Sequence, residues 1–153
     1  MSTTGPHRVE LESWISCAPF ERLLQMTIES AEAGRAVLSM PFAGEMAQGA
    51  GLMHGGALVS LADTACGMAV KSLLRPWVRF ATTDMQIRFL RPVVRGHVTA
   101  RAAVLGRQDR RLQTEALVYD DEGRAVMELS ATFKVARAAP APFLKPPKEQ
   151  AGR

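Results

Sequence analysis

The residues best suited to chemistry lie in one segment, 54–63, where a histidine and two glycines are followed by a single aspartate. Acyl transfer needs backbone N–H groups aimed at a carbonyl oxygen, and a carboxylate that attacks the carbonyl carbon or activates water. Gly55 and Gly56 open a long apolar helix, whose first-turn N–H groups lack partners within the helix and carry the positive end of its dipole. Because glycine has no side chain, a carbonyl can approach these groups closely. Asp63 supplies the carboxylate.

The spacing of these groups keeps them apart on one helix. Asp63 follows Gly55 by eight residues, which is about 12 Å along a helix axis. An attacking atom has to lie about 3–3.5 Å from the carbonyl carbon, so one chain cannot bring both groups to the same carbonyl. Two such helices packed antiparallel across a two-fold axis would place the start of one beside the middle of the other. We therefore expect a homodimer with two shared sites.

These residues also have ordinary structural interpretations. Glycines often flank packed helices, and a helical aspartate is most often solvated. Asp63 lies on a stripe of polar or small residues that recur at steps of three and four, namely Ser60, Asp63, Thr64, Gly67 and Lys71. We expect His54 to support the loop rather than transfer a proton, because no second acid lies near it in the sequence. A triad of Ser60, His97 and Asp84 is discounted, since no nucleophile elbow surrounds the serine.

The composition favours one folded domain. The chain has 153 residues, of which 47% are hydrophobic, enough for a substantial core. No apolar run is long enough to span a bilayer, and the N-terminus has no apolar signal-peptide core, so we expect a cytoplasmic protein without a membrane partner. Cys17 and Cys66 are too few for a disulfide framework or a zinc cluster. We expect both to be buried, and we expect no metal site.

The net charge gives little support to nucleic-acid binding. It is +4 for the whole chain, and segment 138–153 contributes +2, with three basic residues against one acidic residue. The difference, +4 minus +2, leaves +2 for the rest of the chain. No stripe of aromatic and basic residues accompanies this mild charge, which suits a small anionic ligand.

Hydrophobic patterning predicts an α+β domain at 10–137, between a flexible lead at 1–9 and a disordered, proline-rich basic tail at 138–153. The expected elements are a short helix that Pro19 ends, a hairpin, a long helix and a four-strand meander: 10–18, 23–32, 35–42, 55–74, 80–91, 97–105, 112–119 and 125–136. A curved antiparallel sheet around the long helix would cover its broad apolar face. In the first strand of the meander, strict alternation places Met85 on the face opposite Thr82.

Three motifs resemble the hotdog-fold acyl-CoA thioesterases, specifically their phenylacetate-pathway (PaaI-like) branch. They are Gly-Leu-Met-His-Gly-Gly-Ala-Leu at 51–58, Leu-Ala-Asp at 61–63, and Thr-Thr-Asp-Met-Gln-Ile-Arg-Phe-Leu-Arg-Pro at 82–92. The resemblance implies a hotdog fold, in which about six antiparallel strands wrap around one long central helix. It also implies dimerisation through the sheet edge and the helix. Whether two dimers pair further into a homotetramer stays open.

The same resemblance implies roles for the matching residues. The N–H of Gly55 donates to the thioester oxygen, and Asp63 acts as nucleophile or general base. His54 orders the loop, and the hydroxyl of Thr82 helps to position the attacking water. Relatives often have asparagine six residues before the histidine, where this chain has Gln48. Its amide is one methylene further from the backbone, which leaves open whether it orients water or the histidine.

The implied substrate is an acyl-CoA thioester, with coenzyme A as part of the substrate and no separate cofactor. Guanidinium groups suit the phosphates of its nucleotide, and the candidates are Arg91, Arg95, Arg107, Arg110 and Arg111. Met53, with Met46 and Met68, would provide an adaptable apolar lining for the acyl group. Gly56 and Thr83 complete the candidate substrate-binding residues. For each arginine, an ordinary solvated turn or strand position is the better interpretation, and for the methionines an ordinary core position is equally good.

Three functions compete. The first is hydrolysis of a small aromatic or short- to medium-chain acyl-CoA to a free acid and CoA. The second, a hotdog dehydratase or hydratase, would need an Asp-x-Asn-Pro-x-His motif or a helix glutamate, and neither is present in this chain or its helix 55–74. The third is a non-catalytic acyl-CoA-binding hotdog protein, against which the intact Asp63 argues. The sequence favours the hydrolase and does not identify the acyl group.

Overall fold

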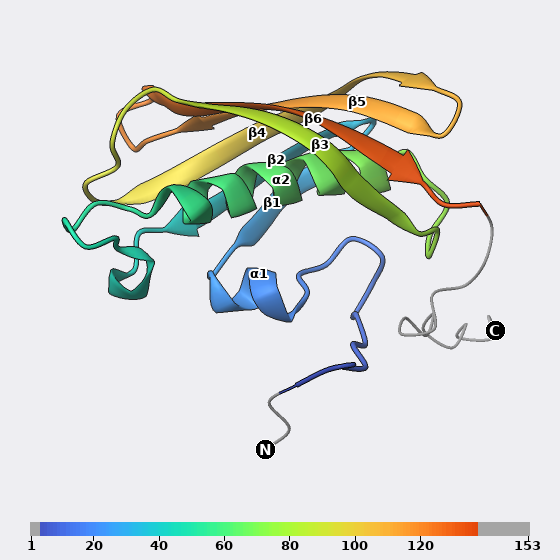
Figure 1. The fold of residues 1–153 in the computed structure, drawn as a ribbon, viewed down its shortest axis with the longest axis horizontal. Helices are drawn as coiled ribbons and strands as arrows, with labels where there is room; N and C mark the ends of the chain where they lie inside the picture. The colour runs from blue at the N-terminus through green and yellow to red at the C-terminus, as the bar shows by residue number, and fades with distance from the viewer. Residues whose placement is uncertain (1–3, 138–153) are drawn as a thin grey trace.

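A curved antiparallel sheet wraps around one long helix in the computed structural model, which describes residues 4–137. The tail expected at 138–153 and the first three residues of the lead lie outside the described residues. The six strands are β1 (Thr27–Glu32), β2 (Arg35–Pro41), β3 (Phe80–Phe89), β4 (His97–Gln108), β5 (Arg111–Tyr119) and β6 (Ala125–Val135). The helix α2 (Gly55–Lys71) lies in the hollow of the sheet, and the short helix α1 (Pro19–Leu23) lies beyond it (Figure 1). The expected α+β architecture is confirmed.

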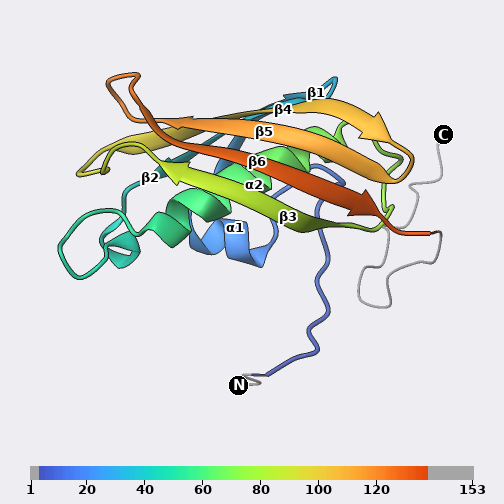
Figure 2. The same ribbon diagram turned by 45° about the horizontal axis from the view of Figure 1, so that its top comes forward.

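The apolar face of α2 is what the sheet encloses. Six residues on this face, which recur at helical spacing, are wholly buried against the strands: Leu61, Ala62, Ala65, Cys66, Ala69 and Val70. His54 caps the helix from an extended backbone conformation, and the positively charged Lys71 lies in its last turn, where it complements the helix dipole. The helix ends at Lys71, three residues before the expected end. The curl of the sheet over the helix is clear in Figure 2.

The expected four-strand meander is wrong, because β3 does not pair with β4. The strand order is β1-β2-β4-β5-β6-β3, so β4, β5 and β6 form the meander and β3 lies at the far edge, beside β6. Packing explains the order. The inward side chains of β4 are small and buried, including Val98 and Ala100 at 0% exposure, which suits the centre of the sheet over α2. Most of β3 is exposed, which suits an edge.

A β-bulge in β3 changes which side chains face the helix. Thr82 pairs with Phe133 and Asp84 with Thr132, so Thr83 is the extra residue. An extra residue shifts the alternation of a strand by one position. Thr82 therefore faces α2 together with Met85, which pairs with the buried Ala131. The expected strict alternation, which put these two residues on opposite faces, is wrong.

The N-terminal segment holds the end of α2 rather than forming the helix expected at 10–18. Pro19 begins α1 instead of ending a helix, because its fixed φ and missing N–H suit a first helical position. Trp14 Nε1 donates to the carbonyl oxygen of Lys71 at 3.0 Å, and Lys71 Nζ donates back to the carbonyl oxygen of Trp14 at 2.9 Å. The Trp14 ring also contacts Phe80, at the start of β3, edge to face. This segment thus fixes the end of α2 relative to the edge strand.

Smaller differences concern the ends of elements and the cysteines. The strand β4 continues to Gln108, three residues beyond the expected end at 105, and the turn before β5 includes Asp109, whose φ is +55°. Cys66 is buried as expected, and burial raises the pKa of its thiol to about 12. Cys17 is only partly buried. Within residues 4–137, no helix has the length and apolar character needed to cross a membrane.

Candidate functional site

The first turn of α2 presents one backbone donor, that of Gly55. The Gly56 N–H donates to His54 Nδ1 at 2.8 Å, and the Ala57 N–H donates to the His54 carbonyl oxygen at 2.9 Å. The Gly55 N–H has no hydrogen-bond partner in the described part of the chain. The expectation that both glycine N–H groups are uncovered is therefore wrong for Gly56. Its missing side chain instead makes room for the imidazole, since a Cβ there would lie 2.9 Å from His54 Nδ1.

The loop before α2 holds this first turn in place. It contains the short 3₁₀ helix η1 (Gly44–Met46), and the His54 N–H donates to the Met46 carbonyl oxygen at 2.7 Å. The Met53 N–H donates to the Val93 carbonyl oxygen at 2.9 Å. These bonds tie the loop to itself and to the segment after β3. The imidazole accepts through Nδ1, so that nitrogen carries no proton, and His54 acts as a helix cap.

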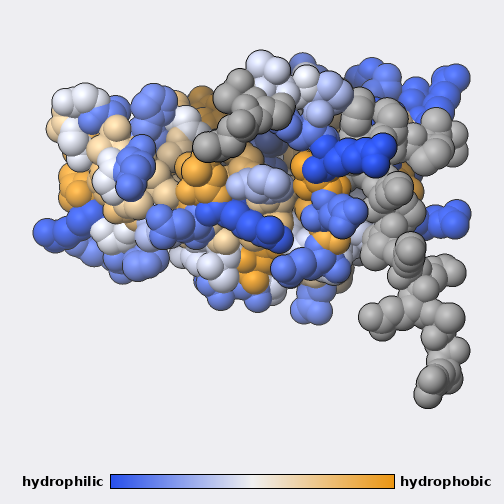
Figure 3. Space-filling view, turned by 90° about the horizontal axis from the view of Figure 1, so that it is seen from below, coloured by the Kyte–Doolittle hydropathy of each residue, from blue (hydrophilic) through white to orange (hydrophobic). Residues whose placement is uncertain are grey.

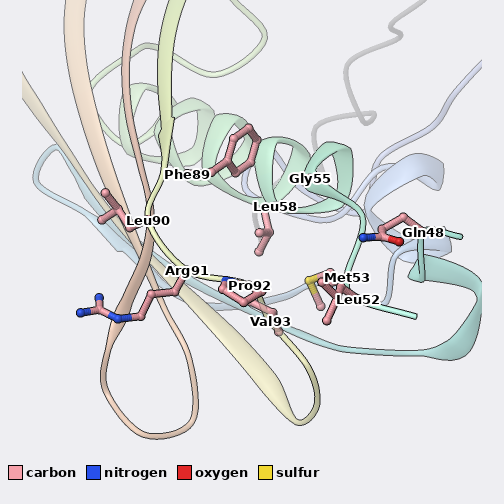
Figure 4. Close-up of a pocket in the computed structure, with 10 residues that line it drawn as sticks. All are labelled: Gln48, Leu52, Met53, Gly55, Leu58, Phe89, Leu90, Arg91, Pro92 and Val93. Atoms are coloured by element: carbon pink, nitrogen blue, oxygen red, sulfur yellow. The ribbon is translucent and has the colours of Figure 1, made fainter. Parts of the chain in front are cut away.

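A cavity of about 370 Å³ opens beside the Gly55 donor (Figure 4). Its walls come from the loop before α2, the first turn of α2, and the end of β3 with the segment that follows. Most of the lining is apolar: Leu52, Met53, Leu58, Leu90, Pro92 and Val93. The ring of Phe89 closes the wall next to Gly55. Sequence reasoning identified Met53 here but missed Phe89 and Leu58, which looked like ordinary strand and core residues.

Two polar side chains lie at the margin of the cavity, and both are engaged by backbone groups. Gln48 Oε1 accepts a hydrogen bond from the Ala50 N–H, so its carboxamide is held within the loop. Arg91 Nη1 donates to the Ala125 carbonyl oxygen at 2.8 Å, and its guanidinium points away from the other lining side chains (Figure 4). The cavity interior therefore offers few polar partners and suits a hydrocarbon group.

The carboxylate of Asp63 lies on a different part of α2, half-buried beneath β3. Thr82 Oγ1 donates to Asp63 Oδ1 at 2.8 Å, a contact that depends on the bulge at Thr83. Burial raises the pKa of Asp63, and the hydrogen bond from Thr82 partly opposes this rise. The solvated aspartate of the ordinary interpretation is not what the structure shows. A carboxylate with a raised pKa and an oriented oxygen is suited to act as base or nucleophile.

One chain therefore carries two separate half-sites. Gln48, Met53, Gly55 and Arg91 line the cavity, whereas neither Asp63 nor Thr82 does. This separation agrees with the distance of about 12 Å that eight helical residues impose. No carboxylate within residues 4–137 lines the cavity at the Gly55 donor. In the same range, no three His, Cys, Asp or Glu side chains lie close enough together to hold a metal ion.

The remaining candidate residues lie outside both half-sites. Thr83 is exposed on the bulge, and its Oγ1 donates to the Thr132 carbonyl oxygen at 3.3 Å. Arg107 Nε donates to the Asp109 carbonyl oxygen at 2.9 Å, at the tip of the β4–β5 hairpin. Arg110 lies there too, beside Arg111 and Lys134, around a separate hollow. The structure does not bring these residues to the Gly55 cavity of the same chain.

The chain matches the family model described as "Thioesterase superfamily" over residues 50–127. That range covers slightly more than half of the chain and includes Gly55, Asp63 and Thr82. The match confirms the resemblance to thioesterases that the sequence motifs indicate.

Three solved structures share the fold over most of the chain. Protein PA5202 from Pseudomonas aeruginosa is 30% identical, with a TM-score of 0.75 over 78% of this chain and 95% of that one. A thioesterase family protein from Silicibacter pomeroyi is 27% identical, with a TM-score of 0.74 over 78% and 90%. The E. coli PaaI protein from the phenylacetic acid degradation operon is 24% identical, with a TM-score of 0.72 over 82% and 87%, a likeness of fold.

Asp63→Asn is expected to leave the folded chain at least as stable as the wild type at neutral pH. Burial raises the folded-state pKa of Asp63 above its unfolded value, so between those two values the folded state binds more protons. The free energy of unfolding of the wild type therefore falls as pH rises through that window. Asparagine carries no charge and still accepts from Thr82. Urea unfolding from acid to neutral pH measures the free energy of unfolding of both proteins. A wild type that gains stability relative to the variant as pH rises would contradict this expectation.

Proposed function

The chain belongs to the thioesterase superfamily, and from this premise we propose that it hydrolyses acyl-CoA thioesters to a free acid and CoA. The observation that carries the proposal is the combination of a single unpaired N–H donor at an apolar cavity with a half-buried carboxylate oriented by a hydroxyl. The reaction consumes only water and needs no cofactor, since coenzyme A is part of the substrate. We propose small aromatic and short- to medium-chain acyl groups as substrates, and the cytoplasm as the location.

In the proposed reaction, the thioester oxygen accepts a hydrogen bond from the Gly55 N–H, which stabilises the negative charge that develops there. In one route, Asp63 removes a proton from water as the water oxygen adds to the carbonyl carbon, and passes that proton to the CoA sulfur as the C–S bond breaks. In the other, Asp63 itself adds to the carbonyl carbon and the C–S bond breaks, which leaves a mixed anhydride and a CoA thiolate. Water then hydrolyses the anhydride, which frees Asp63 and supplies the proton that the thiolate takes up. Thr82 keeps one carboxylate oxygen oriented. Both routes convert one thioester and one water into one acid and one thiol.

The edge strand β3 supports a site shared by two chains. Its inward side chains are left partly uncovered by α2: Met85 and Ile87 are 37% exposed and Phe89 is 56% exposed. Figure 3 looks from the side away from the sheet and shows apolar surface between hydrophilic side chains. An uncovered, apolar sheet edge is suited to pairing with a second copy. If two β3 strands pair antiparallel, the Phe89 end of one meets the Thr82 end of the other, which joins the two half-sites.

A non-catalytic acyl-CoA-binding protein is the alternative. It would use the cavity but would gain nothing from a carboxylate held partly out of solvent, which lowers stability. A dehydratase based on a helix glutamate is disfavoured, because α2 contains none.

Asp63→Asn is expected to lower kcat/KM for acyl-CoA hydrolysis at least about a hundredfold, because it removes the base or nucleophile. A panel of short, medium, long and aromatic acyl-CoA thioesters measures this through released thiol. The wild-type rate should rise with pH through a pKa above that of an ordinary aspartate. Asp109→Asn is the matched control, since this exposed turn residue has the left-handed conformation that asparagine tolerates. Full activity of Asp63→Asn would exclude the proposed role, and a wild type inactive on the whole panel would favour the binding protein.

Gly55→Pro tests the oxyanion donor, because proline has no backbone N–H. Gly55 is the first helical residue, and His54 before it is extended. The backbone of both residues is therefore compatible with a proline at position 55. Gly55→Ala is the control, because it adds a methyl group and keeps the N–H. We expect the proline variant to lose about a hundredfold to a thousandfold in kcat relative to the alanine variant. Equal rates in two folded variants would show that this N–H is not the donor.

Mixed dimers test whether the site is shared. Co-expression of Gly55→Pro with Asp63→Asn, each inactive alone, should restore about a quarter of wild-type activity. Half of randomly mixed dimers are heterodimers, and each has one intact site that combines Gly55 of one chain with Asp63 of the other. Two differently tagged chains and sequential purification isolate these dimers. An inactive mixed dimer would place both groups in one chain.

A further inference from the structure

The ring of Phe89 occupies the space beside the Gly55 donor. A Cβ built on Gly55 would lie 3.0 Å from Phe89 Cζ and 3.2 Å from Cε1, so the tip of the ring rests against the backbone of the first turn. The ring spans from the end of β3 to the start of α2 and forms one wall of the cavity (Figure 4). It is 56% exposed, so it lies at the mouth of the cavity rather than in its depth.

We propose that Phe89 sets the width of the acyl site next to the reacting carbonyl, and that the enzyme thereby prefers acyl groups unbranched at the carbon attached to that carbonyl. The inference rests on the proposed function, because it assumes that the thioester oxygen binds the Gly55 N–H. With the oxygen there, the carbonyl carbon and its neighbour lie beside the backbone that the ring covers. A methyl branch on that neighbour would meet the ring.

The distal part of the cavity is formed by other residues, so Phe89 controls width near the carbonyl rather than chain length. Leu52, Met53 and Val93 form the far wall and come from the loop before α2 and the segment after β3. The cavity of about 370 Å³ is more than twice the roughly 150 Å³ that holds a benzene molecule in a protein interior. Its volume therefore accepts a sizeable acyl group, and Phe89 forms the wall that lies beside the Gly55 donor.

Pairs of isomeric substrates distinguish the effect of the width of the acyl site from the effects of the size and apolarity of the acyl group. Butyryl-CoA and isobutyryl-CoA have the same composition, but only isobutyryl-CoA is branched next to the carbonyl. We expect the wild type to favour butyryl-CoA and Phe89→Ala to raise the isobutyryl-to-butyryl ratio of kcat/KM by about tenfold or more, the scale of one methyl group in a closed pocket. Pentanoyl-CoA and isovaleryl-CoA, branched one carbon further away, should show a smaller change.

Phe20→Ala is the matched control, because Phe20 on α1 is 55% exposed and does not line the cavity. Its isomer ratios should equal those of the wild type. An unchanged isobutyryl-to-butyryl ratio in Phe89→Ala, or an equal preference in the wild type, would overturn the inference while leaving hydrolysis intact. If the wild type hydrolyses no thioester, the proposed function fails separately. Calorimetry then measures the binding of S-butyl-CoA and S-isobutyl-CoA, in which CH₂ replaces the carbonyl, and so tests the width of the acyl site alone. A ratio of the two Kd values that Phe89→Ala leaves unchanged would overturn the inference.

Discussion

Burial of one face of α2 under the curved sheet is the interaction on which the other features depend. Leu61 and three alanines, Ala62, Ala65 and Ala69, are wholly buried there. Small side chains let strands approach a helix closely, and close packing resists sliding or rotation. The first turn of α2 is therefore held beside the segment after β3, and its middle is held beside the start of β3. Both half-sites keep their positions because the helix cannot move within the sheet.

The structure places an energetic cost where the proposed chemistry needs it. A half-buried carboxylate is less favourable than a solvated one, and an apolar edge strand is less favourable than a covered one. In this chain both features occur on β3 and on the adjoining side of α2. The opposite edge of the sheet, β1, carries no comparable row of large apolar side chains. This asymmetry makes β3 the edge that suits the proposed pairing of two chains, and that edge lies beside the carboxylate.

Local patterns in the sequence were sufficient for α2, for the six strands and for naming the candidate residues, but not for the N-terminal segment or for how the elements are combined. The period of the apolar residues predicts α2, and the alternation predicts the strands. Strand order depends on which strand best covers the helix, and only the packing of β4 decides that. The bulge at Thr83 has no periodic signature. The cavity combines two segments distant in sequence, 48–58 and 89–93, so Phe89 could not be recognised beside Gly55 before folding brought it there.

The bulge in β3 makes the orientation of the carboxylate depend on strand register as well as on residue identity. Thr82 faces Asp63 because Thr83 is left as an unpaired extra residue between Thr82 and Asp84. If Thr83 paired in regular register instead, strict alternation would turn the Thr82 hydroxyl to the outer surface, with every residue of the site still present. Two relatives could thus share the same motif letters and differ in whether the aspartate is oriented. In this fold, the pairing register of β3 carries functional information that the motif residues alone do not show.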